Sequence, residues 1–349
     1  MAFRGIYPAA ELTPSEFGLL SVARVTSHTA RNYDERWIRG FSFEFDSRPT
    51  VRLLEDGGTS VHTLFDGTGL SRYIEVTPFF IEVEDYRSTF SLTGEDRFAR
   101  VLKQIEAATQ KATERELWTG YVTRTDGTSN QYLANTSTLT YASSAPQTAV
   151  TAWRAVALLE NGLASSPIGE EGVLHITRDI AIQLVSDGSI IRDDRGFVHL
   201  ETINGTKVSS GSGYTGDGPI LEVTNKALNS NVATITTATS HYLSTGETVT
   251  ISGVDATFNG TYAVTGTPSA TTFTYAKTAS NVSSTSATGS AQMKGTESVK
   301  WIYATGSVDV HLGKPEVVND TLAQGYDVSG NQNDTVSYTH LTLPTKRIV

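Results

Sequence analysis

The stretch "GEDRFARVLKQIEAATQKATERELW", residues 94–118, decides the fold. Its apolar side chains recur every three or four residues, and Lys, Glu and Gln occupy the opposite side. Thr93 and Asp96 resemble a capping box with the shorter acid in place of Glu. The pattern predicts one helix of about 24 residues, which is long for a globular protein. Its apolar face comprises Phe98, Val101, Leu102, Ile105, Ala108 and Ala112, and its acidic side chains, expected on a solvated face, are Glu95, Asp96, Glu106, Glu114 and Glu116.

Two alternating stretches precede this helix and predict strands. In "WIRGFSFEF", residues 37–45, the rings of Phe41, Phe43 and Phe45 alternate with polar side chains. In "YIEVTPFFIEVEDY", residues 73–86, Phe79 and Ile81 belong to a second alternation. A period of two is typical of half-buried strands. Because the turn clusters "EDGGTS" and "FDGTG" lie between them, this region is expected to form a long β-ribbon with loops.

A mixed segment follows the long helix. A second helix is predicted from Pro146 to Glu160, with Gly162 as its terminator. Beyond it the sequence predicts a strand, a short helix that opens at Thr177, and paired strands joined by Asp-Gly and Asn-Gly turns. His175 and His199 lie within these strands, where a packed or edge position is more common than a catalytic one.

The composition changes sharply at about residue 220. Between Asn229 and Gln292 the only charged residues are Glu247, Asp255 and Lys277, and Thr and Ser dominate. Short strand patterns with turn signals every eight to twelve residues are typical of an all-β sandwich. We therefore expect an α+β body interrupted by a small Ig-like or sandwich domain. Candidates for its core are Phe258, Tyr262 and Phe273, and candidates for weak surface adhesion to sugars are His241, Tyr242 and Tyr275.

Composition and motif spacing exclude several classes of function. The formal net charge of −10 argues against a surface that coats nucleic acid, because phosphate neutralisation needs clustered Lys and Arg. The chain has no cysteine, and its 7 histidines are scattered singly, so neither thiolate chemistry nor a local metal site is expected. No segment has the length of a signal peptide or a membrane span, which makes a cytoplasm the expected compartment. We expect no enzyme, no cofactor and no metal.

The motif "GSGYTG", residues 211–216, matches the glycine spacing of a dinucleotide-binding loop. That fingerprint requires a helix after the glycines, so that the helix N-terminus faces the pyrophosphate. Here Pro219 and a strand-like stretch follow instead. A flexible hinge into the inserted domain is therefore the preferred interpretation.

The order of these segments resembles a known family. A long arm, a ribbon, a helix closing on "ERELWTG", and then "VLHITRDIAIQLV", "ETINGTKVSSGSGYTG" and "KWIYATGSVDV" resemble major capsid proteins of tailed bacteriophages, especially those of actinobacterial phages. The resemblance covers residues 15–220 and 297–325, and it rests on layout more than on invariant residues. It implies the Hong Kong 97 capsid fold, with an N-terminal arm, an extended loop, a spine helix and an axial domain.

The resemblance also implies a division of the chain. The expected parts are an N-terminal arm (1–50), an extended β loop (51–92), the spine helix with the peripheral domain (93–165), an axial domain with a partial return to the peripheral domain (166–219 and 296–335), the inserted β domain (220–295) and a tail (336–349).

The implied function is a shell. Many copies would assemble in the host bacterial cytoplasm into the icosahedral capsid of a virion around DNA bound non-specifically. Scaffold, portal or decoration proteins are further partners, the inserted domain projects outward toward cell-surface carbohydrate, and no membrane is involved. An arm and a ribbon without their own core would bury apolar residues on neighbouring subunits. The expected inter-subunit contacts are Trp37, Phe41, Phe43, Phe45, Phe79 and Ile81, although these residues could instead pack on their own subunit.

Two other functions remain open at this point. A phage tail or surface protein would use the β domain to bind carbohydrate. An encapsulin-like compartment shell shares the implied fold, and neighbouring genes would distinguish it, since a cargo enzyme accompanies a compartment whereas terminase and portal accompany a phage head.

The end of the chain has a different character. The peptide "VSYTHLTLPT", followed by "KRIV" (residues 336–349 together), resembles a transposase-type sequencing adapter translated in frame. The nucleotide record decides this, since the adapter requires the codons GTC TCT TAT ACA CAT CTG ACG CTG CCG ACG. If this interpretation holds, the native C-terminus is missing, and the sheet beside the long helix should show an unpaired edge or a substitute strand.

Overall fold

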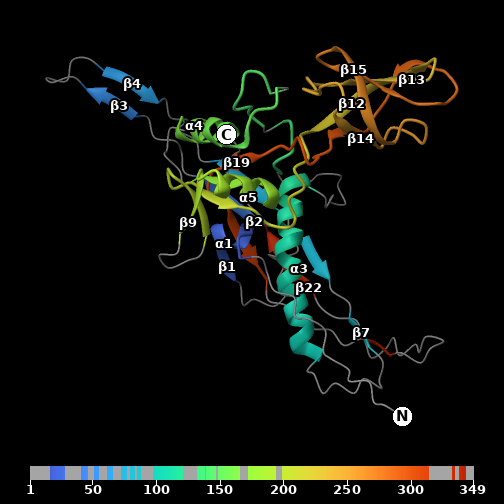
Figure 1. Cartoon of the computed structure of the whole chain (residues 1–349). Coiled ribbons are helices and arrows are strands. Elements are labelled where there is room, and N and C mark those ends of the chain that lie inside the picture. The colour runs from blue at the N-terminus through green and yellow to red at the C-terminus, as the bar shows by residue number, and fades with distance from the viewer. Residues whose placement is uncertain are drawn as a thin grey trace.

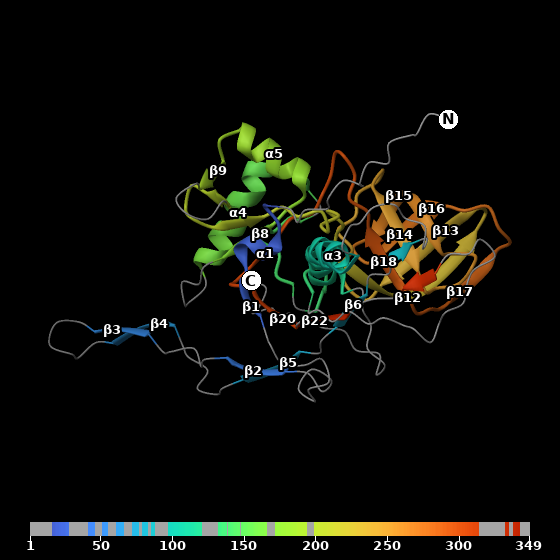
Figure 2. The ribbon, with the colours of Figure 1, turned by 90° about the horizontal axis from the view of Figure 1, so that it is seen from below.

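The chain is described by a computed structural model. The described residues are 16–27, 41–45, 51–54, 61–65, 72–76, 79–82, 85–87, 97–120, 132–137, 139–146, 148–165, 172–193, 199–313, 332–334 and 338–342. Figures 1 and 2 show helix α3 (Arg97–Thr119) between a layer that carries two helices, drawn in green, and a β lobe drawn in orange. Helices and sheets therefore build an α+β protein around one long helix.

Helix α3 confirms the long helix predicted from its apolar periodicity. The structure places Ile105 of the predicted apolar face at 1% exposure. Near the C-terminal end of the helix, Leu117 and Trp118 are 0% exposed. Leu19, Phe79 and Tyr303 belong to the same buried cluster as these two residues, so segments far apart in the sequence cover this end of the helix.

The acidic side chains of α3 divide into two groups. Glu106 is exposed, as predicted. Glu114 and Glu116 are 0% and 3% exposed, so the prediction of a solvated face is wrong for these two. Glu95 and Asp96 lie outside the described residues. A period of 3.6 identifies the apolar face, but it does not reveal that the opposite face is also covered.

A four-stranded sheet lies beside α3. Its strands, in order, are β1 (Arg24–Ser27), β20 (Asp309–Leu312), β22 (Tyr338–Thr342) and β6 (Phe79–Glu82). The pair β1–β20 is parallel, and the other two pairs are antiparallel. Residues of β6, of the short helix α1 (Leu19–Val22) and of α3 share one buried cluster here. This cluster is the hydrophobic core between the four-stranded sheet and α3.

Strand β22 falls within the stretch that resembles an adapter. It pairs with β20 and with β6, and Leu341 lies opposite Leu312 on one side and Phe79 on the other. For this sheet the sequence predicts either an unpaired edge or a substitute strand. The structure shows a strand from residues 338–342 in that place.

A five-stranded sheet forms the second layer. Its order is β19 (Tyr303–Thr305), β8 (Val173–His175), β11 (Lys207–Ser209), β10 (His199–Thr202) and β9 (Ile190–Asp193). Helices α4 (Ala152–Ala164) and α5 (Arg178–Ser186) contribute to the buried cluster on one face of this sheet. Helix α5 opens after Thr177 as predicted, whereas α4 begins six residues later than predicted and continues past Gly162. An Asn-Gly turn with Gly205 at φ +84° joins β10 to β11.

The inserted lobe consists of antiparallel strands between Ile220 and Met293. Their order is β13 (Val232–Thr237), β16 (Thr272–Ala276), β15 (Gly260–Ser269), β14 (Thr248–Ser252), β18 (Ser290–Met293), β12 (Ile220–Asn229) and β17 (Val282–Ser286). Because β12 also pairs with β13, every strand except β17 belongs to a closed ring. Closure removes exposed sheet edges. The lobe is therefore a strand barrel, where the sequence predicts an Ig-like sandwich.

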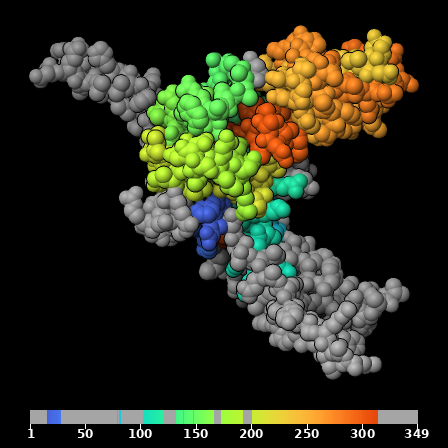
Figure 3. Space-filling view, viewed as in Figure 1, coloured from blue at the N-terminus to red at the C-terminus, as the bar shows by residue number. Residues whose placement is uncertain are grey.

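The barrel has its own core and forms a distinct lobe in the space-filling view (Figure 3). Phe258 and Phe273 are 0% exposed and lie in this core, and Tyr262 packs against it. These are the three residues predicted as its core.

Three further strand pairs show no third strand among the described residues. They are β2 (Phe41–Phe45) with β5 (Arg72–Val76), β3 (Val51–Leu54) with β4 (Val61–Phe65), and β7 (Asp85–Arg87) with β21 (Gln332–Asp334). All three are antiparallel. The β3–β4 ribbon stands apart from the body in both ribbon views (Figures 1 and 2).

Candidate functional site

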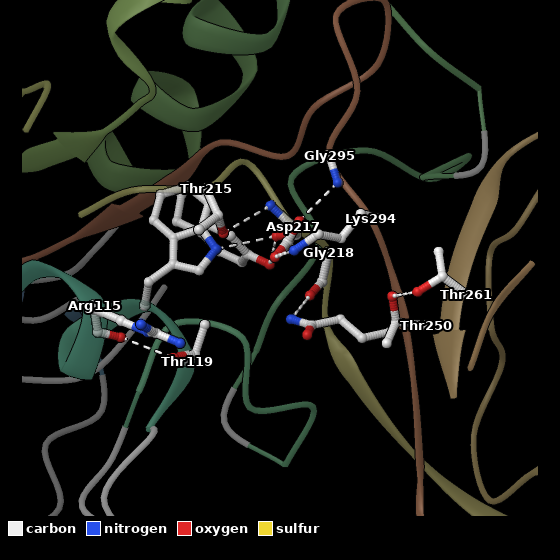
Figure 4. Close-up of polar contacts among 12 residues, drawn as sticks. Arg115, Thr119, Thr215, Asp217, Gly218, Thr250, Thr261, Lys294 and Gly295 are labelled. Atoms are coloured by element: carbon white, nitrogen blue, oxygen red, sulfur yellow. Dashed lines mark hydrogen bonds and ion pairs between the residues drawn. The ribbon is translucent and has the colours of Figure 1, made fainter. Parts of the chain in front are cut away.

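The barrel joins the body through two adjacent chain crossings, and Figure 4 shows the contacts that tie them together. Asp217 lies in the first crossing. Its carboxylate accepts hydrogen bonds from Lys294 Nζ and from the Gly295 amide of the second crossing, both at 2.8 Å. Its carbonyl oxygen accepts a hydrogen bond from the indole N–H of Trp118 at 3.2 Å. Asp217 is 4% exposed and the side chain of Lys294 is half exposed, so this clamp connects both crossings to α3 beside the solvent.

The glycine motif at residues 211–216 packs directly on α3. A Cβ atom at Gly211 would overlap the carboxylate of Glu114, and one at Gly213 would lie 2.5 Å from the carbonyl oxygen of Lys111. The Gly213 amide donates a hydrogen bond to Glu114 Oε2 at 2.8 Å. Glycine is needed here for close approach to a helix. The interpretation as a flexible hinge is therefore wrong.

Glu114 is the point where three chain segments meet. Its Oε1 atom accepts hydrogen bonds from the Leu19 amide at 3.0 Å and from Gln110 Nε2 at 3.1 Å, while Oε2 accepts the Gly213 amide. Burial raises the pKa of this carboxyl, and the bonds from Leu19 and Gly213 act in the opposite direction. Since every contact is internal to the fold, Glu114 has a structural role.

His175 lies at the centre of a second buried polar network. Its Nδ1 atom is 3.0 Å from the Tyr214 hydroxyl, and its Nε2 atom is 2.9 Å from Thr305 Oγ1. The Tyr214 hydroxyl is 2.8 Å from Ser209 Oγ. Burial lowers the pKa of His175 to about 3, so the imidazole is neutral at pH 7. This confirms the predicted packed position, in a strand rather than in an accessible site.

A cavity of about 380 Å³ lies where the barrel meets the body. Its wall combines the segment before α4, one side of α5, a barrel loop and the segment that returns from the barrel. Tyr141 from the first segment packs edge-on against Tyr242 of the barrel loop, with ring centroids 4.7 Å apart. Trp301 of the returning segment lies 6.0 Å from Tyr141. The sequence signal for this site was weak, because its aromatic residues come from three distant segments.

The barrel loop that carries Tyr242 is held in an unusual conformation. Tyr242 has φ +50°, a left-handed value that is rare for a bulky residue. On one side, His241 bridges the loop: the Leu243 amide donates to its Nδ1 at 2.9 Å, and its Nε2 lies 2.9 Å from the Ser269 carbonyl oxygen. On the other side, the Ser244 amide donates to Glu247 Oε2 at 2.8 Å. These bonds hold the loop backbone on both sides of Tyr242, and the ring packs against Tyr141 at the cavity wall.

The predicted adhesion residues fall in different places. Tyr275 is 0% exposed in the barrel core, and His241 is 7% exposed. Neither ring can stack on a ligand at the surface, so the prediction is wrong for these two. Tyr242 alone of the three is half-buried and lines the cavity.

The predicted inter-subunit residues also divide. Phe79 and Ile81 are 4% and 8% exposed and pack in the core beside α3, so the structure supports the alternative that they pack on their own subunit. The backbones of Phe41, Phe43 and Phe45 form strand β2. Their side chains, and Trp37 as a whole, lie outside what the structure describes.

An exposed apolar surface lies on the helix-bearing layer. Ile182 and Val185, three residues apart on α5, are 68% and 46% exposed, and Ile191 of β9 is 44% exposed. Contacts join α5 to β9, and β9 is the last strand at one edge of the five-stranded sheet. We call these three residues the α5–β9 surface. It combines apolar side chains with a strand edge.

The described residues show neither a metal-binding cluster nor a membrane-spanning helix. Within the ranges that the structure describes, no three His, Asp or Glu side chains come together as metal ligands. No helix in that part of the chain is both long and apolar enough to cross a membrane.

Comparison with known proteins finds matches among solved structures. No protein-family model matches the chain, and no curated protein matches it. The matching solved structures include a chain described as "Capsid of native GTA particle computed with C5 symmetry". That chain is 9% identical in sequence, with a TM-score of 0.44, over 99% of this chain and 91% of that chain. Similarity of this degree does not by itself establish a shared function.

Proposed function

We propose that the chain is a shell-forming subunit of a tailed-bacteriophage head, with the Hong Kong 97 type of capsid fold. Copies assemble into an icosahedral capsid around packaged DNA in the host cytoplasm. The role is structural, not enzymatic. Scaffold, portal and decoration proteins are the further partners that such a shell implies.

The observation that carries the proposal is the set of strand pairs that show no third strand among the described residues. A two-stranded pair is marginally stable in water and needs a third strand or a packing partner. The β3–β4 ribbon stands apart from the described body in both ribbon views, and among the described residues its own subunit gives it no third strand. A neighbouring copy supplies a packing partner in a shell. The long helix beside a small sheet and the separate helix-bearing layer also follow the layout that the family resemblance implies.

The α5–β9 surface supplies a second kind of contact. Apolar side chains rimmed by polar ones are typical of surfaces that bind another protein. Among the described residues no strand pairs with the outer side of β9, and such an edge would otherwise be open to uncontrolled strand pairing. A second copy of the chain that packs on Ile182, Val185 and Ile191 would cover both features.

The test is the assembly state of the full-length chain. Electron microscopy and sedimentation velocity should show capsomers or shells. The double variant Ile182→Glu/Val185→Glu places charges at the proposed contact, and burying them unpaired is costly. It should raise the concentration needed for assembly at least roughly tenfold. The matched control is Val232→Glu, at a residue that is 44% exposed on barrel strand β13, and it should assemble normally.

A monodisperse wild-type monomer across the whole concentration range would overturn the proposal. If the double variant and the control assemble equally well, the α5–β9 surface takes no part in assembly. Shells that hold an enzyme instead of DNA when isolated from the native source would indicate the encapsulin-like compartment.

A further inference from the structure

The cavity between barrel and body takes no part in the proposed assembly contacts. Its volume of about 380 Å³ lies within the range of about 300–1,000 Å³ that is typical of small-molecule sites. Both lobes contribute to its wall within a single subunit. Any ligand there would contact the barrel and the body together.

The aromatic part of the wall favours a ligand with an apolar face. Tyr141, Tyr242 and Trp301 form a linked group, with Tyr141 edge-on to both of the other rings. Aromatic rings offer a large apolar surface, and tyrosine and tryptophan add a polar atom at the rim. Burial raises the pKa of Tyr141 to about 12, so its hydroxyl keeps its proton at pH 7.

The conformation of Tyr242 indicates a ligand contact. A non-glycine residue in the left-handed region costs free energy, and such strain concentrates at sites that clamp a ligand. The loop maintains it through the His241 bridge and the Ser244–Glu247 hydrogen bond. The ring is thus positioned before a ligand arrives, which lowers the entropic cost of binding.

The charged side chains of the wall indicate which polar groups a ligand would carry. Asp179, Glu247 and Glu297 contribute carboxylates, while Lys300 contributes a cation that already pairs with Asp179. An anionic ligand is therefore repelled. A purely apolar ligand would desolvate the carboxylates without replacing their hydrogen bonds. Hydroxyl groups suit them, because an ionised carboxylate only accepts hydrogen bonds.

We propose that this cavity binds a neutral saccharide, one or two sugar units in size. The hydroxyl groups donate to the carboxylates, and the apolar face of a sugar ring lies against the aromatic group. The site differs from the one expected from the sequence, because it lies at the base of the barrel and shares only Tyr242 with it. It is complete in one subunit, so binding does not depend on the proposed assembly.

Saturation-transfer NMR on the full-length chain tests the proposal. The probes are glucose, galactose, mannose, N-acetylglucosamine and their β1,4-linked disaccharides, with N-acetylneuraminic acid as the anionic probe and toluene as the apolar one. At least one neutral sugar should bind with a Kd on the order of 1–10 mM, which is typical for so small a ligand. The anionic probe should not bind.

Two variants separate binding from folding. Tyr242→Gly removes the ring and relieves the left-handed strain, because glycine tolerates positive φ. It should remain folded, because relief of the strain partly offsets the lost contact with Tyr141, yet bind the sugar at least roughly tenfold more weakly. The matched control Tyr262→Phe alters a tyrosine of the barrel outside the cavity wall and should bind like wild type.

Three outcomes would overturn the proposal. These are no binding of any neutral sugar to wild type, unchanged binding to the folded Tyr242→Gly variant, and binding of toluene or N-acetylneuraminic acid alone. Each is independent of whether the chain assembles, so failure here leaves the proposed function to its own test.

Discussion

Replacing His175 by glutamine should make the protein less stable than wild type at pH 7 and more stable than wild type at pH 4. In the native state burial holds the pKa of His175 at about 3, against an ordinary value of 6.5. The unfolded chain therefore binds a proton between these values while the folded chain does not. By linkage, the stability that neutral His175 contributes is complete above pH 6.5 and is lost as the pH falls toward 3.

The magnitude follows from the two pKa values. At pH 4 the unfolded state gains about 3 kcal/mol relative to the folded state from this residue alone. For a body of this size that corresponds to a fall in Tm of about 6–12 °C. Glutamine does not titrate, but it is shorter and gives up one of the hydrogen bonds to Tyr214 and Thr305, which costs about 1 kcal/mol. His175→Gln should thus be less stable than wild type at pH 7 and more stable at pH 4.

Thermal unfolding followed by tryptophan fluorescence measures this. Trp118 is 0% exposed, and its ring centroid lies 5.1 Å from that of Tyr214, which contacts His175. The difference in Tm between wild type and variant removes the effect of other titrating groups. A difference that stays constant from pH 7 to pH 4 would refute the idea that neutral His175 is held by burial.

Three further predictions concern the clusters around α3 and the barrel. The pKa of Glu114 is raised, so the stability that it contributes is complete below the ordinary value of 4.5 and is lost as the pH rises through the raised value. Glu114→Gln mimics the protonated form, so its free energy of unfolding in urea should rise relative to that of wild type between pH 4 and pH 7. The opposite trend would mean that the hydrogen bonds outweigh burial. Phe273→Ala removes a side chain that is 0% exposed and should lower the stability of the barrel, measured by hydrogen exchange, by about 3–5 kcal/mol. The unfolding of the body, followed by the fluorescence of Trp118, should not change. An equal loss of stability in barrel and body would contradict separate cores. Asp217→Ala breaks the clamp with Lys294, which should lower the free energy of unfolding by about 1–3 kcal/mol and speed limited proteolysis at the crossings. An unchanged cleavage rate would count against the clamp.

Local periodicity was enough to predict the helix α3 and the core of the barrel. In α3 the apolar repeat continues for several turns, so the signal is strong. The placement of Tyr275 could also have been predicted, since it follows Phe273 by two residues in strand β16 and therefore shares its inward face. Assigning it to the surface overlooked the period of two.

Other features depend on contacts that no local pattern contains. Closure of the barrel requires β12 to pair with β13 as well as with β18, and strand spacing does not reveal that ring. The burial of Glu114 depends on amides 95 and 99 residues away in sequence. The cavity likewise draws its aromatic rings from three segments. Long-range placement of this kind is set by tertiary packing, which overrides local propensity.

The two crossings at Asp217 have a consequence for how such a chain could change over time. The Gly218 amide bonds the Met293 carbonyl oxygen at 3.0 Å, so the inserted segment leaves the body and re-enters it at nearly the same point. To the rest of the protein, the barrel is equivalent to a short turn, and the entropic cost of closing a loop grows only slowly with its length. Domain insertion is tolerated where chain ends lie close together. The junction is thus a point at which a different module could replace the barrel, or a tight turn could close the gap, with adaptation of the body surface at Tyr141 and Trp301 that now contacts the barrel.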